Sequence, residues 1–143
     1  MSIEVNSALP VEIVPLLLVE NEEDDAIITR ALLSDIRGTT FKIDWVETYE
    51  AGLNSMIENL HHICVLDHCL GKRTGIELLQ AARERGSHIP VVMLTGNLDP
   101  TIQGNATTIG VRSFLIKGQT DAALLEQAIH QAREETLRLE VRR

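Results

Sequence analysis

Short runs of consecutive apolar residues recur along the chain, separated by longer segments with helical periodicity. Leu16 to Val19 and Ile63 to Leu66 are uninterrupted runs, which is typical of strands buried on both faces of a parallel sheet. Pro90 precedes a third run, and a proline is tolerated at the start of a strand. The segments expected as strands are 16–19, 41–46, 63–66, 91–95 and 113–116.

Helical periodicity follows each of these strands. The first helical segment is expected to bury Ile28, Ala31 and Leu32, which recur on one helical face. Thr48 and Thr120 are expected to cap the second and the last helix, because a hydroxyl at this position accepts from free backbone N–H groups. The helical segments are 23–36, 48–60, 75–85, a weak helix that begins at Asp99 and Pro100, and one from residue 120 to the end of the chain.

Five strands that alternate with five helices predict one parallel sheet with helices on both faces. Apolar and polar residues alternate in the second strand, which favours a half-buried or edge position. A chain of 143 residues fits one domain. We expect residues 13–132 to form this domain, with residues 1–12 as an N-terminal extension and residues 133–143 as an extension of the last helix.

Charge and composition exclude several functional classes. The net charge is −8 and no stripe of lysine and arginine occurs before the last few residues, which argues against direct nucleic-acid binding. No apolar run approaches the roughly 20 residues that span a bilayer, and the N-terminus lacks the basic segment of a signal peptide. Cys64 and Cys69 are too few for a disulfide framework. We therefore expect a cytoplasmic protein with reduced thiols that binds neither nucleic acid nor membrane.

Polar residues follow the expected strands. In an open parallel sheet, functional residues collect at the carboxyl ends of the strands, beside the point where the strand order reverses. Glu20 and Asn21 follow the first strand and Asp67 follows the third, and a 2-1-3-4-5 order makes these strands neighbours. Acids this close repel one another unless a cation lies among them. Hard oxygen ligands of this kind suit Mg²⁺.

The other two strand ends carry groups that suit a phosphoryl group. Thr95 and Gly96 follow the fourth strand and Lys117 follows the fifth. A hydroxyl, an ammonium and a divalent metal can together hold the three oxygens of a phosphoryl group, while Gly96 leaves room for it to enter. Transfer to a carboxylate needs these parts and a positioned nucleophile. The pattern therefore predicts phosphoryl transfer to Asp67.

At these four strand ends the chain resembles a bacterial response-regulator receiver domain of two-component systems, over roughly residues 16–132. The resemblance implies a flavodoxin-like, doubly wound α/β fold with strand order 2-1-3-4-5. The matching motifs are Leu17 to Asn21, Asp67 with Gly75 and Glu77, Leu94 to Gly96, and Phe114 to Lys117.

The resemblance also implies a mechanism in signal transduction. A histidine kinase or a phosphotransfer protein of a phosphorelay donates the phosphoryl group of a phosphohistidine to Asp67. Thr95 and Phe114 then shift and remodel a protein-binding face, which is a population shift between two states. Such a domain is a phosphoacceptor that assists its own phosphorylation and dephosphorylation rather than an enzyme. A downstream protein partner, or an effector domain outside this sequence, is expected to read the switch.

The same resemblance implies the Mg²⁺ ligands: Glu20, the side chain at position 21, Asp67 and the backbone carbonyl of Cys69, with Glu22 as a further candidate. The family usually has an aspartate where this chain has Asn21. An amide oxygen can bind Mg²⁺ but carries no charge, so we expect weak binding.

Two further departures from the family pattern lie near the same site. Gly118 replaces the usual proline after the site lysine, so a cis peptide bond there is not assumed. The loop that contains Lys72 and Arg73 also lacks its usual proline and adds two cations.

Asn21 also motivates an alternative function, a receiver-like interaction module that is never phosphorylated. Two other functional classes each lack a feature that they require. A haloacid-dehalogenase-like phosphatase requires a second aspartate where this chain has Cys69, and a flavodoxin-like cofactor binder requires a phosphate loop where this chain has the acidic run 20–25.

The last helix carries a heptad-like seam, in which Leu125, Ile129, Ala132, Thr136 and Leu139 recur at spacings of 4, 3, 4 and 3. Its second half is rich in arginine and glutamate. One interpretation is a frayed, solvated tail, because short isolated helices are marginal in water. The other is a signalling helix that forms a homodimer with a second copy or leads toward an effector.

Overall fold

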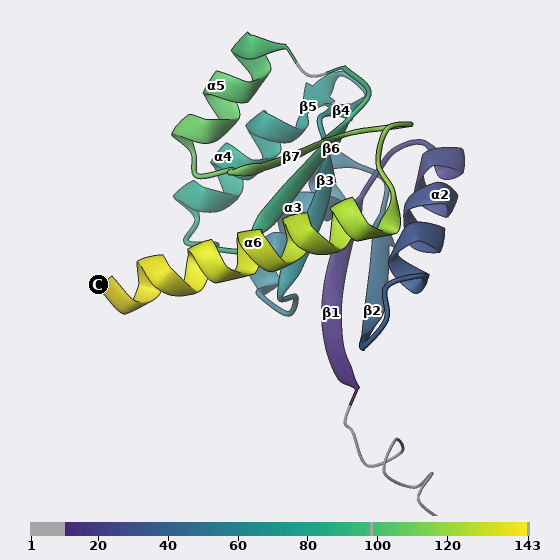
Figure 1. Ribbon diagram of the computed structural model, residues 1–143. Helices are drawn as coiled ribbons and strands as arrows, with labels where there is room; N and C mark the ends of the chain where they lie inside the picture. The colour runs from purple at the N-terminus through teal and green to yellow at the C-terminus, as the bar shows by residue number, and fades with distance from the viewer. Residues whose placement is uncertain (1–10, 98, 143) are drawn as a thin grey trace, which may run out of the picture.

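A parallel sheet of five strands lies at the centre of the protein, in a computed structural model that describes residues 11–97 and 99–142 (Figure 1). The strand order is β2-β1-β3-β6-β7, which confirms the order predicted from the sequence. The strands are β1 (Glu12–Val19), β2 (Thr39–Val46), β3 (Ile63–Asp67), β6 (Val91–Thr95) and β7 (Ser113–Ile116).

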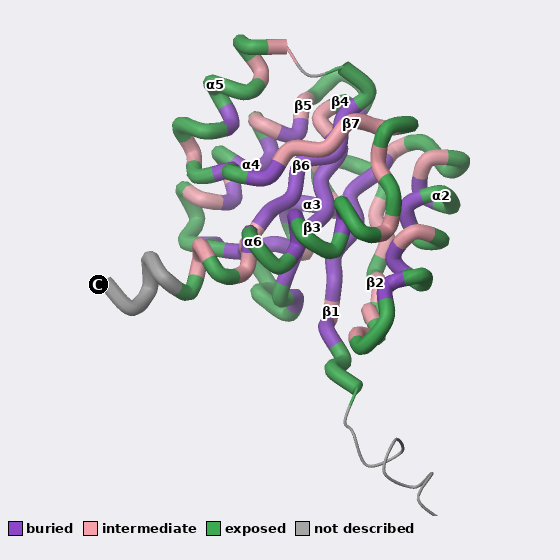
Figure 2. Tube along the Cα trace, in the orientation of Figure 1, coloured by how far each residue is buried: buried purple, intermediate pink, exposed green. Residues whose placement is uncertain are grey.

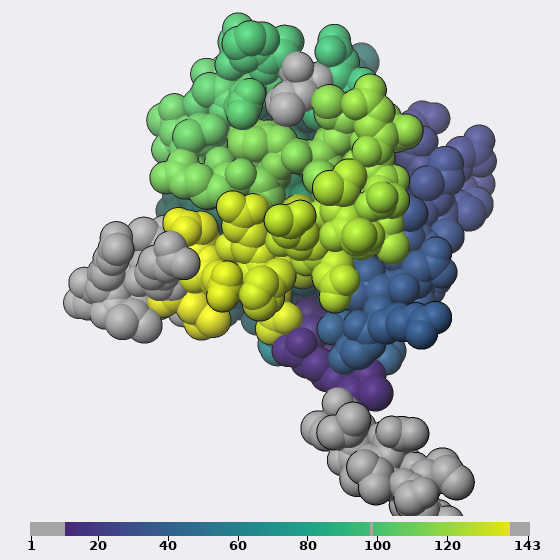
Figure 3. Space-filling view, viewed as in Figure 1, coloured from purple at the N-terminus to yellow at the C-terminus, as the bar shows by residue number. Residues whose placement is uncertain are grey.

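Helices cover both faces of the sheet, as Figure 1 shows, so the molecule has three layers. Helices α3, α4 and α5 pack on one face, and α2 and α6 pack on the other. Helix α6 runs across the face that is turned to the viewer in Figure 3. The helices are α2 (Glu23–Ser34), α3 (Tyr49–Glu58), α4 (Gly75–Glu84), α5 (Pro100–Thr108) and α6 (Ala122–Arg142).

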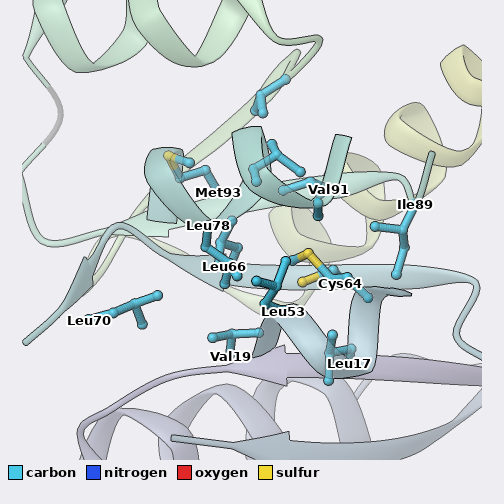
Figure 4. Packing of buried hydrophobic residues seen from close by; sticks show 14 of the residues in the cluster. Leu17, Val19, Leu53, Cys64, Leu66, Leu70, Leu78, Ile89, Val91 and Met93 are labelled. Carbon is cyan, nitrogen blue, oxygen red and sulfur yellow. The ribbon is translucent and has the colours of Figure 1, made fainter. Parts of the chain in front are cut away.

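Alternate residues of the central strands feed two separate hydrophobic clusters. In β1, Leu17 and Val19 face α3 and α4, whereas Leu16 and Leu18 face α2 and α6. Figure 2 shows the central strands buried along most of their length, and Figure 4 shows the first cluster at close range. Burial on both faces explains why the sequence of these strands is continuously apolar rather than alternating.

The edge strand β2 differs from the central strands as predicted. Exposed and half-buried residues alternate along most of it, because it pairs only with β1 and only one of its faces lies against the core. Trp45 packs from β2 against the cluster under α2 and α6, and its indole N–H donates to the carbonyl of Glu20 at 2.8 Å.

Helix α2 buries a different face from the predicted one. Ile28 and Ala31 are exposed and Leu32 is only half-buried, so the predicted stripe is wrong. The buried residues are Ala26, Thr29 and Leu33. The small side chains of Ala26 and Thr29 allow the helix to lie close to the sheet. Close packing therefore decides which face is buried, and the larger side chains of Ile27 and Ile28 stay exposed.

The helix termini agree with the sequence in two of three cases. The Thr48 hydroxyl accepts from Ala51 N–H at 3.1 Å and caps α3, and Asp99 accepts from Ile102 N–H at 2.9 Å and caps α5. For α6 the prediction was wrong, because Asp121 accepts from Leu124 N–H at 2.8 Å. The hydroxyl of Thr120 instead donates to the carbonyl of Ile116, at 2.8 Å.

Helix α6 continues past the sheet without a break. Leu125, Ile129 and Ala132 of the predicted seam are buried against the sheet, so they are part of the core rather than a free seam. Beyond them, Arg133 lies 3.3 Å from a carboxylate oxygen of Glu12, and Thr136 is half-buried. The side chain of Leu139 lies outside the described residues, as does most of the predicted extension 1–12. The division into extensions and domain stays a prediction.

No helix in the described part of the chain combines the length and apolar character that crossing a bilayer requires.

Replacing a fully buried core leucine should cost much more stability than replacing an exposed one. Leu78 of α4 is 0% exposed and Leu124 of α6 is 43% exposed. We expect Leu78→Ala to lower the free energy of unfolding by about 2–5 kcal/mol, because it leaves a cavity. The control Leu124→Ala should change it by no more than about 0.5 kcal/mol. Urea unfolding measures both, and equal losses would contradict this assignment of the core.

Candidate functional site

The carboxyl edge of the sheet brings together four residues predicted from the sequence. Asp67 ends β3 and Thr95 ends β6, while Glu20 and Lys117 directly follow β1 and β7. Because all five strands are parallel, these ends meet at one edge. Asp67 is 4% exposed, Glu20 is 1% exposed and Thr95 is 2% exposed. Charged groups this buried need partners.

Lys117 is the partner that joins the acids. Its Nζ lies 2.9 Å from Glu20 Oε1, 2.9 Å from Asp25 Oδ2 and 3.2 Å from Asp67 Oδ2. Burial alone would lower the pKa of Lys117, but hydrogen bonds to Asp25 and Glu20 and the charges of Asp67 and Glu20 raise its pKa above the ordinary value. The side chain is therefore a fixed ammonium.

Asp25 belongs to this cluster, and the sequence analysis missed it. Within the acidic run 20–25, only Glu20, Asn21 and Glu22 were assigned to the site from the sequence. Asp25 lies in the first turn of α2 and is half-buried. A helix that begins directly after the β1 loop places its first turn near the strand ends, and this was the available signal.

Glu20 is held in an unfavourable environment. Burial and, after it, the neighbouring Asp67 raise the pKa of Glu20 to about 7, although Lys117 opposes the shift. Glu20 Oε2 also accepts from the backbone N–H of Glu22 at 3.2 Å. Two buried carboxylates that share one ammonium form a site that a further cation would stabilise.

The Asp67 carboxylate is oriented at both oxygens. Oδ2 faces Lys117, and Oδ1 accepts from the backbone N–H of Cys69 at 3.2 Å. Cys69 begins a small antiparallel hairpin that the sequence analysis did not predict, made of β4 (Cys69–Leu70) and β5 (Arg73–Thr74).

The start of α4 lies close beneath the same strand end. A Cβ atom at Gly75 would lie 2.5 Å from the carbonyl oxygen of Asp67. This distance is far below van der Waals contact, so the approach of α4 requires glycine here.

The remaining predicted residues are near the edge but do not all contact Asp67. The Thr95 hydroxyl donates to the carbonyl of Asn97 at 3.3 Å and accepts from its N–H at 3.4 Å, so it is engaged with the loop after β6. Gly96 is exposed, with open space where a Cβ would be. Phe114 is half-buried and packs against the cluster under α3, α4 and α5. The backbone N–H of Lys117 donates to the carbonyl of Thr95 at 2.8 Å and joins these two strand ends.

The oxygen donors at this edge fit Mg²⁺ in chemical type. Glu20 and Asp67 supply carboxylates, and Asn21, which is half-buried, supplies an amide. Glu22 has an exposed side chain. Among the residues that the structure describes, no group of three or more His, Cys, Asp or Glu side chains forms a metal site by itself. Mg²⁺ usually takes one or two carboxylates and keeps several waters, so such a cage is not required.

Comparison with known proteins agrees with this geometry. A family model described as the response regulator receiver domain matches residues 16–129. The transcriptional regulatory protein DltR of Streptococcus agalactiae is 30% identical over 102 residues, which cover 71% of this chain and 44% of DltR. The two-component response regulator ORR3 of Oryza sativa is 30% identical over 99 residues, which cover 66% of this chain and 75% of ORR3. The chain thus spans less than half the length of DltR.

Solved structures show the same fold. A CheY-like response regulator receiver domain protein from Methanospirillum hungatei JF-1 has a TM-score of 0.75 at 17% identity, covering 89% of this chain and 98% of that one. A two-component response regulator of the LuxR family from Aurantimonas sp. SI85-9A1 has a TM-score of 0.76 at 19% identity and covers 87% of both chains. At these identities the likeness establishes the fold alone.

The raised pKa of Glu20 predicts a pH dependence of stability for the metal-free protein. Folded Glu20, with a pKa of about 7, keeps its proton up to about pH 7, whereas the unfolded chain releases it near the ordinary glutamate pKa of 4.5. The folded state binds more protons in this window, so the stability that Glu20 contributes should be fully present below pH 4.5 and be lost as the pH rises toward 7. Each unit of pKa difference corresponds to about 1.4 kcal/mol.

Urea unfolding in EDTA at several pH values between 4.5 and 8 measures this effect. Glu20→Gln should lose this component of the pH dependence, whereas Glu23→Gln at the exposed start of α2 should keep it. The same pH profile for wild type and Glu20→Gln would contradict the assignment.

Proposed function

The chain belongs to the response regulator receiver domain family, and from this premise we propose that Asp67 accepts a phosphoryl group from the phosphohistidine of a histidine kinase or phosphotransfer protein. Receiver domains are signalling domains of two-component systems that interact with such proteins and with effector domains. The observation that carries the proposal is the buried Asp67 carboxylate, oriented by Lys117 at 3.2 Å and by the Cys69 N–H at 3.2 Å.

The chemistry follows from these contacts. A carboxylate oxygen of Asp67 attacks phosphorus, a P–O bond forms, and the P–N bond to the donor imidazole breaks with its electron pair leaving on nitrogen. The product is an acyl phosphate on Asp67. The ammonium of Lys117 stabilises the charge on the phosphoryl oxygens, and the Thr95 hydroxyl can donate to one of them.

Receiver domains in general bind Mg²⁺ at the phosphorylation site, and Mg²⁺ adds positive charge to the transferred phosphoryl group. In this chain Glu20, Asn21, Asp67 and the carbonyl of Cys69 would hold it. The amide at 21 is the basis for proposing weak binding, because it removes one charge from the ligand set.

The proposed switch uses Thr95 and Phe114. The two hydrogen bonds of the Thr95 hydroxyl to Asn97 are long, at 3.3 and 3.4 Å, so exchange for a phosphoryl oxygen costs little. The adjoining helix α5 buries only Ala106 fully, which supports a mobile response there. A shift of Thr95 and Phe114 would alter the face of α5, β7 and α6, which a downstream protein or an effector domain would read.

The rim of the site can receive a donor protein. A cleft of about 150 Å³ beside Lys117 is lined by Ile28, Leu32 and Thr120, among others. Ile27 and Ile28 of α2 are each 58% exposed. Exposed apolar side chains next to a reactive group support a protein-binding rim.

We place the phosphoryl transfer in the cytoplasm, where both described cysteines would remain free thiols.

Asn21 supports one alternative, an interaction module of the same fold that is not phosphorylated. The contacts of Asp67 with Lys117 and Cys69 favour the phosphoacceptor.

Phosphorylation should occur on Asp67 alone. With Mg²⁺ and acetyl phosphate, intact-mass spectra should show one phosphoryl adduct, because the buried, oriented carboxylate is the nucleophile. Asp67→Asn should abolish the adduct, and the control Asp24→Asn, at the exposed start of α2, should retain it. An unmodified wild type, or an adduct that persists in Asp67→Asn, would refute the proposal.

Restoring an acid at position 21 should tighten Mg²⁺ binding. We expect Asn21→Asp to gain about 1 kcal/mol or more at an effective dielectric constant near 20. Trp45 is the only tryptophan, and its indole N–H donates to the backbone carbonyl of Glu20. The indole therefore lies next to a proposed Mg²⁺ ligand, and its fluorescence should report the Mg²⁺ titration. Equal or tighter binding by the wild type would contradict the role given to Asn21.

A further inference from the structure

The β4–β5 hairpin controls one of the two contacts that orient Asp67. Cys69 pairs with Thr74, and Leu70 pairs with Arg73. The chain reverses at Gly71, which has a φ of +72° that favours glycine. Figure 1 shows the hairpin at the carboxyl edge of the sheet. Asp67 Oδ1 accepts a hydrogen bond from the backbone N–H of Cys69, the first residue of the hairpin. A movement of the hairpin that shifts Cys69 would therefore change this contact with the carboxylate.

Two features hold the inner side and the end of the hairpin. Leu70 is 6% exposed and belongs to the cluster drawn in Figure 4. Thr74 and Glu77 form a capping box, in which Glu77 N–H donates to the Thr74 hydroxyl at 3.1 Å and Thr74 N–H donates to Glu77 Oε1 at 2.8 Å. Neither feature involves the side chain of Arg73, on the exposed side of β5.

Arg73 makes two contacts outside the hairpin. The central carbon of its guanidinium lies 3.9 Å from the centroid of the Tyr49 ring, and its Nε lies 3.7 Å from Glu77 Oε2. Tyr49 is the first residue of α3, and its ring packs against the core. The cation–π contact therefore ties the hairpin to a helix that is separate from it in sequence.

We propose that Arg73 is a positioning residue for the phosphoacceptor, because its stacking on Tyr49 holds the hairpin in the register that directs the Cys69 N–H at Asp67. This inference rests on the proposed role of Asp67. It differs from a direct electrostatic role of this cation at the site. The guanidinium is directed at Tyr49 and Glu77, whereas Lys117 supplies the positive charge at Asp67.

The test separates the stacking contact from the charge. Tyr49→Leu removes the ring face but keeps Arg73, and Arg73→Gln removes the cation. Arg73→Lys and Tyr49→Phe keep a cation over an aromatic ring and serve as conservative rescues. Glu77→Gln removes the ion pair and retains an oxygen that can accept from Thr74. Arg85→Gln removes a charge from an exposed position at the end of α4 and is the matched control.

Amide hydrogen exchange in the metal-free protein reads the hairpin directly. We expect exchange at Cys69 to accelerate about two- to fivefold in Tyr49→Leu and in Arg73→Gln, which is the factor that an exposed cation–π contact supports. The rate of adduct formation with acetyl phosphate should fall by a similar factor. The double variant should lose no more than either single variant, because both remove the same contact.

Each outcome decides the inference. Wild-type exchange at Cys69 in Arg73→Gln would overturn it, and so would faster exchange at Cys69 with an unchanged rate of adduct formation, which would indicate a loss of stability without a change at Asp67. Slow phosphorylation in Arg73→Gln with normal behaviour in Tyr49→Leu would overturn it in favour of a direct charge effect. If the wild type takes up no phosphoryl group, the proposed function fails, while exchange at Cys69 still decides whether the stacking contact holds the hairpin.

Discussion

The ammonium of Lys117 lies within 3.2 Å of carboxylate oxygens from Glu20, Asp25 and Asp67, which come from three different elements. One positive charge cannot neutralise three acids, so the carboxyl edge of the sheet keeps an excess of negative charge in a recessed position. Burial, together with the neighbouring Asp67, raises the pKa of Glu20. The excess of negative charge favours the binding of a further cation. Removing the ammonium would leave buried charges without a partner, a change that typically costs about 3–5 kcal/mol.

The rest of the fold serves to hold these groups at one edge. Parallel pairing of β1, β3, β6 and β7 brings their ends together, and the two apolar clusters fix the strands from both faces. Close approach of α4 to the end of β3 depends on Gly75. The core therefore supplies rigidity, and the proposed switch involves the less buried helix α5.

Much of this could be predicted from the sequence. Continuous apolar runs identified the buried strands, and their alternation with helices predicted a parallel sheet. The resemblance to receiver domains implied the order of the strands. That order places Glu20 beside Asp67, because parallel strands end at a common edge. The chemistry of Thr95 and Lys117 then followed from what a phosphoryl group requires.

The features that the sequence predicted wrongly or missed depend on how helices and loops pack against one another. The buried face of α2 depends on the small side chains Ala26 and Thr29, which hydrophobic periodicity ranks below Ile28. Asp25 reaches Lys117 from the first turn of α2, across the sheet edge. The stacking of Arg73 on Tyr49 joins residues 24 positions apart, and no local pattern indicates such a contact. Tertiary packing decides all three.

The central claim is that Asp67, and no other acid of the cluster, carries the phosphoryl group. Borohydride reduction of the acetyl-phosphate-treated protein converts an aspartyl phosphate to homoserine, and peptide mass spectrometry then locates the modified residue. The account predicts homoserine at position 67 alone, and only in samples treated with the phosphodonor. A reduced residue at Asp25 or Glu20, or none at all in a protein that binds Mg²⁺, would contradict it.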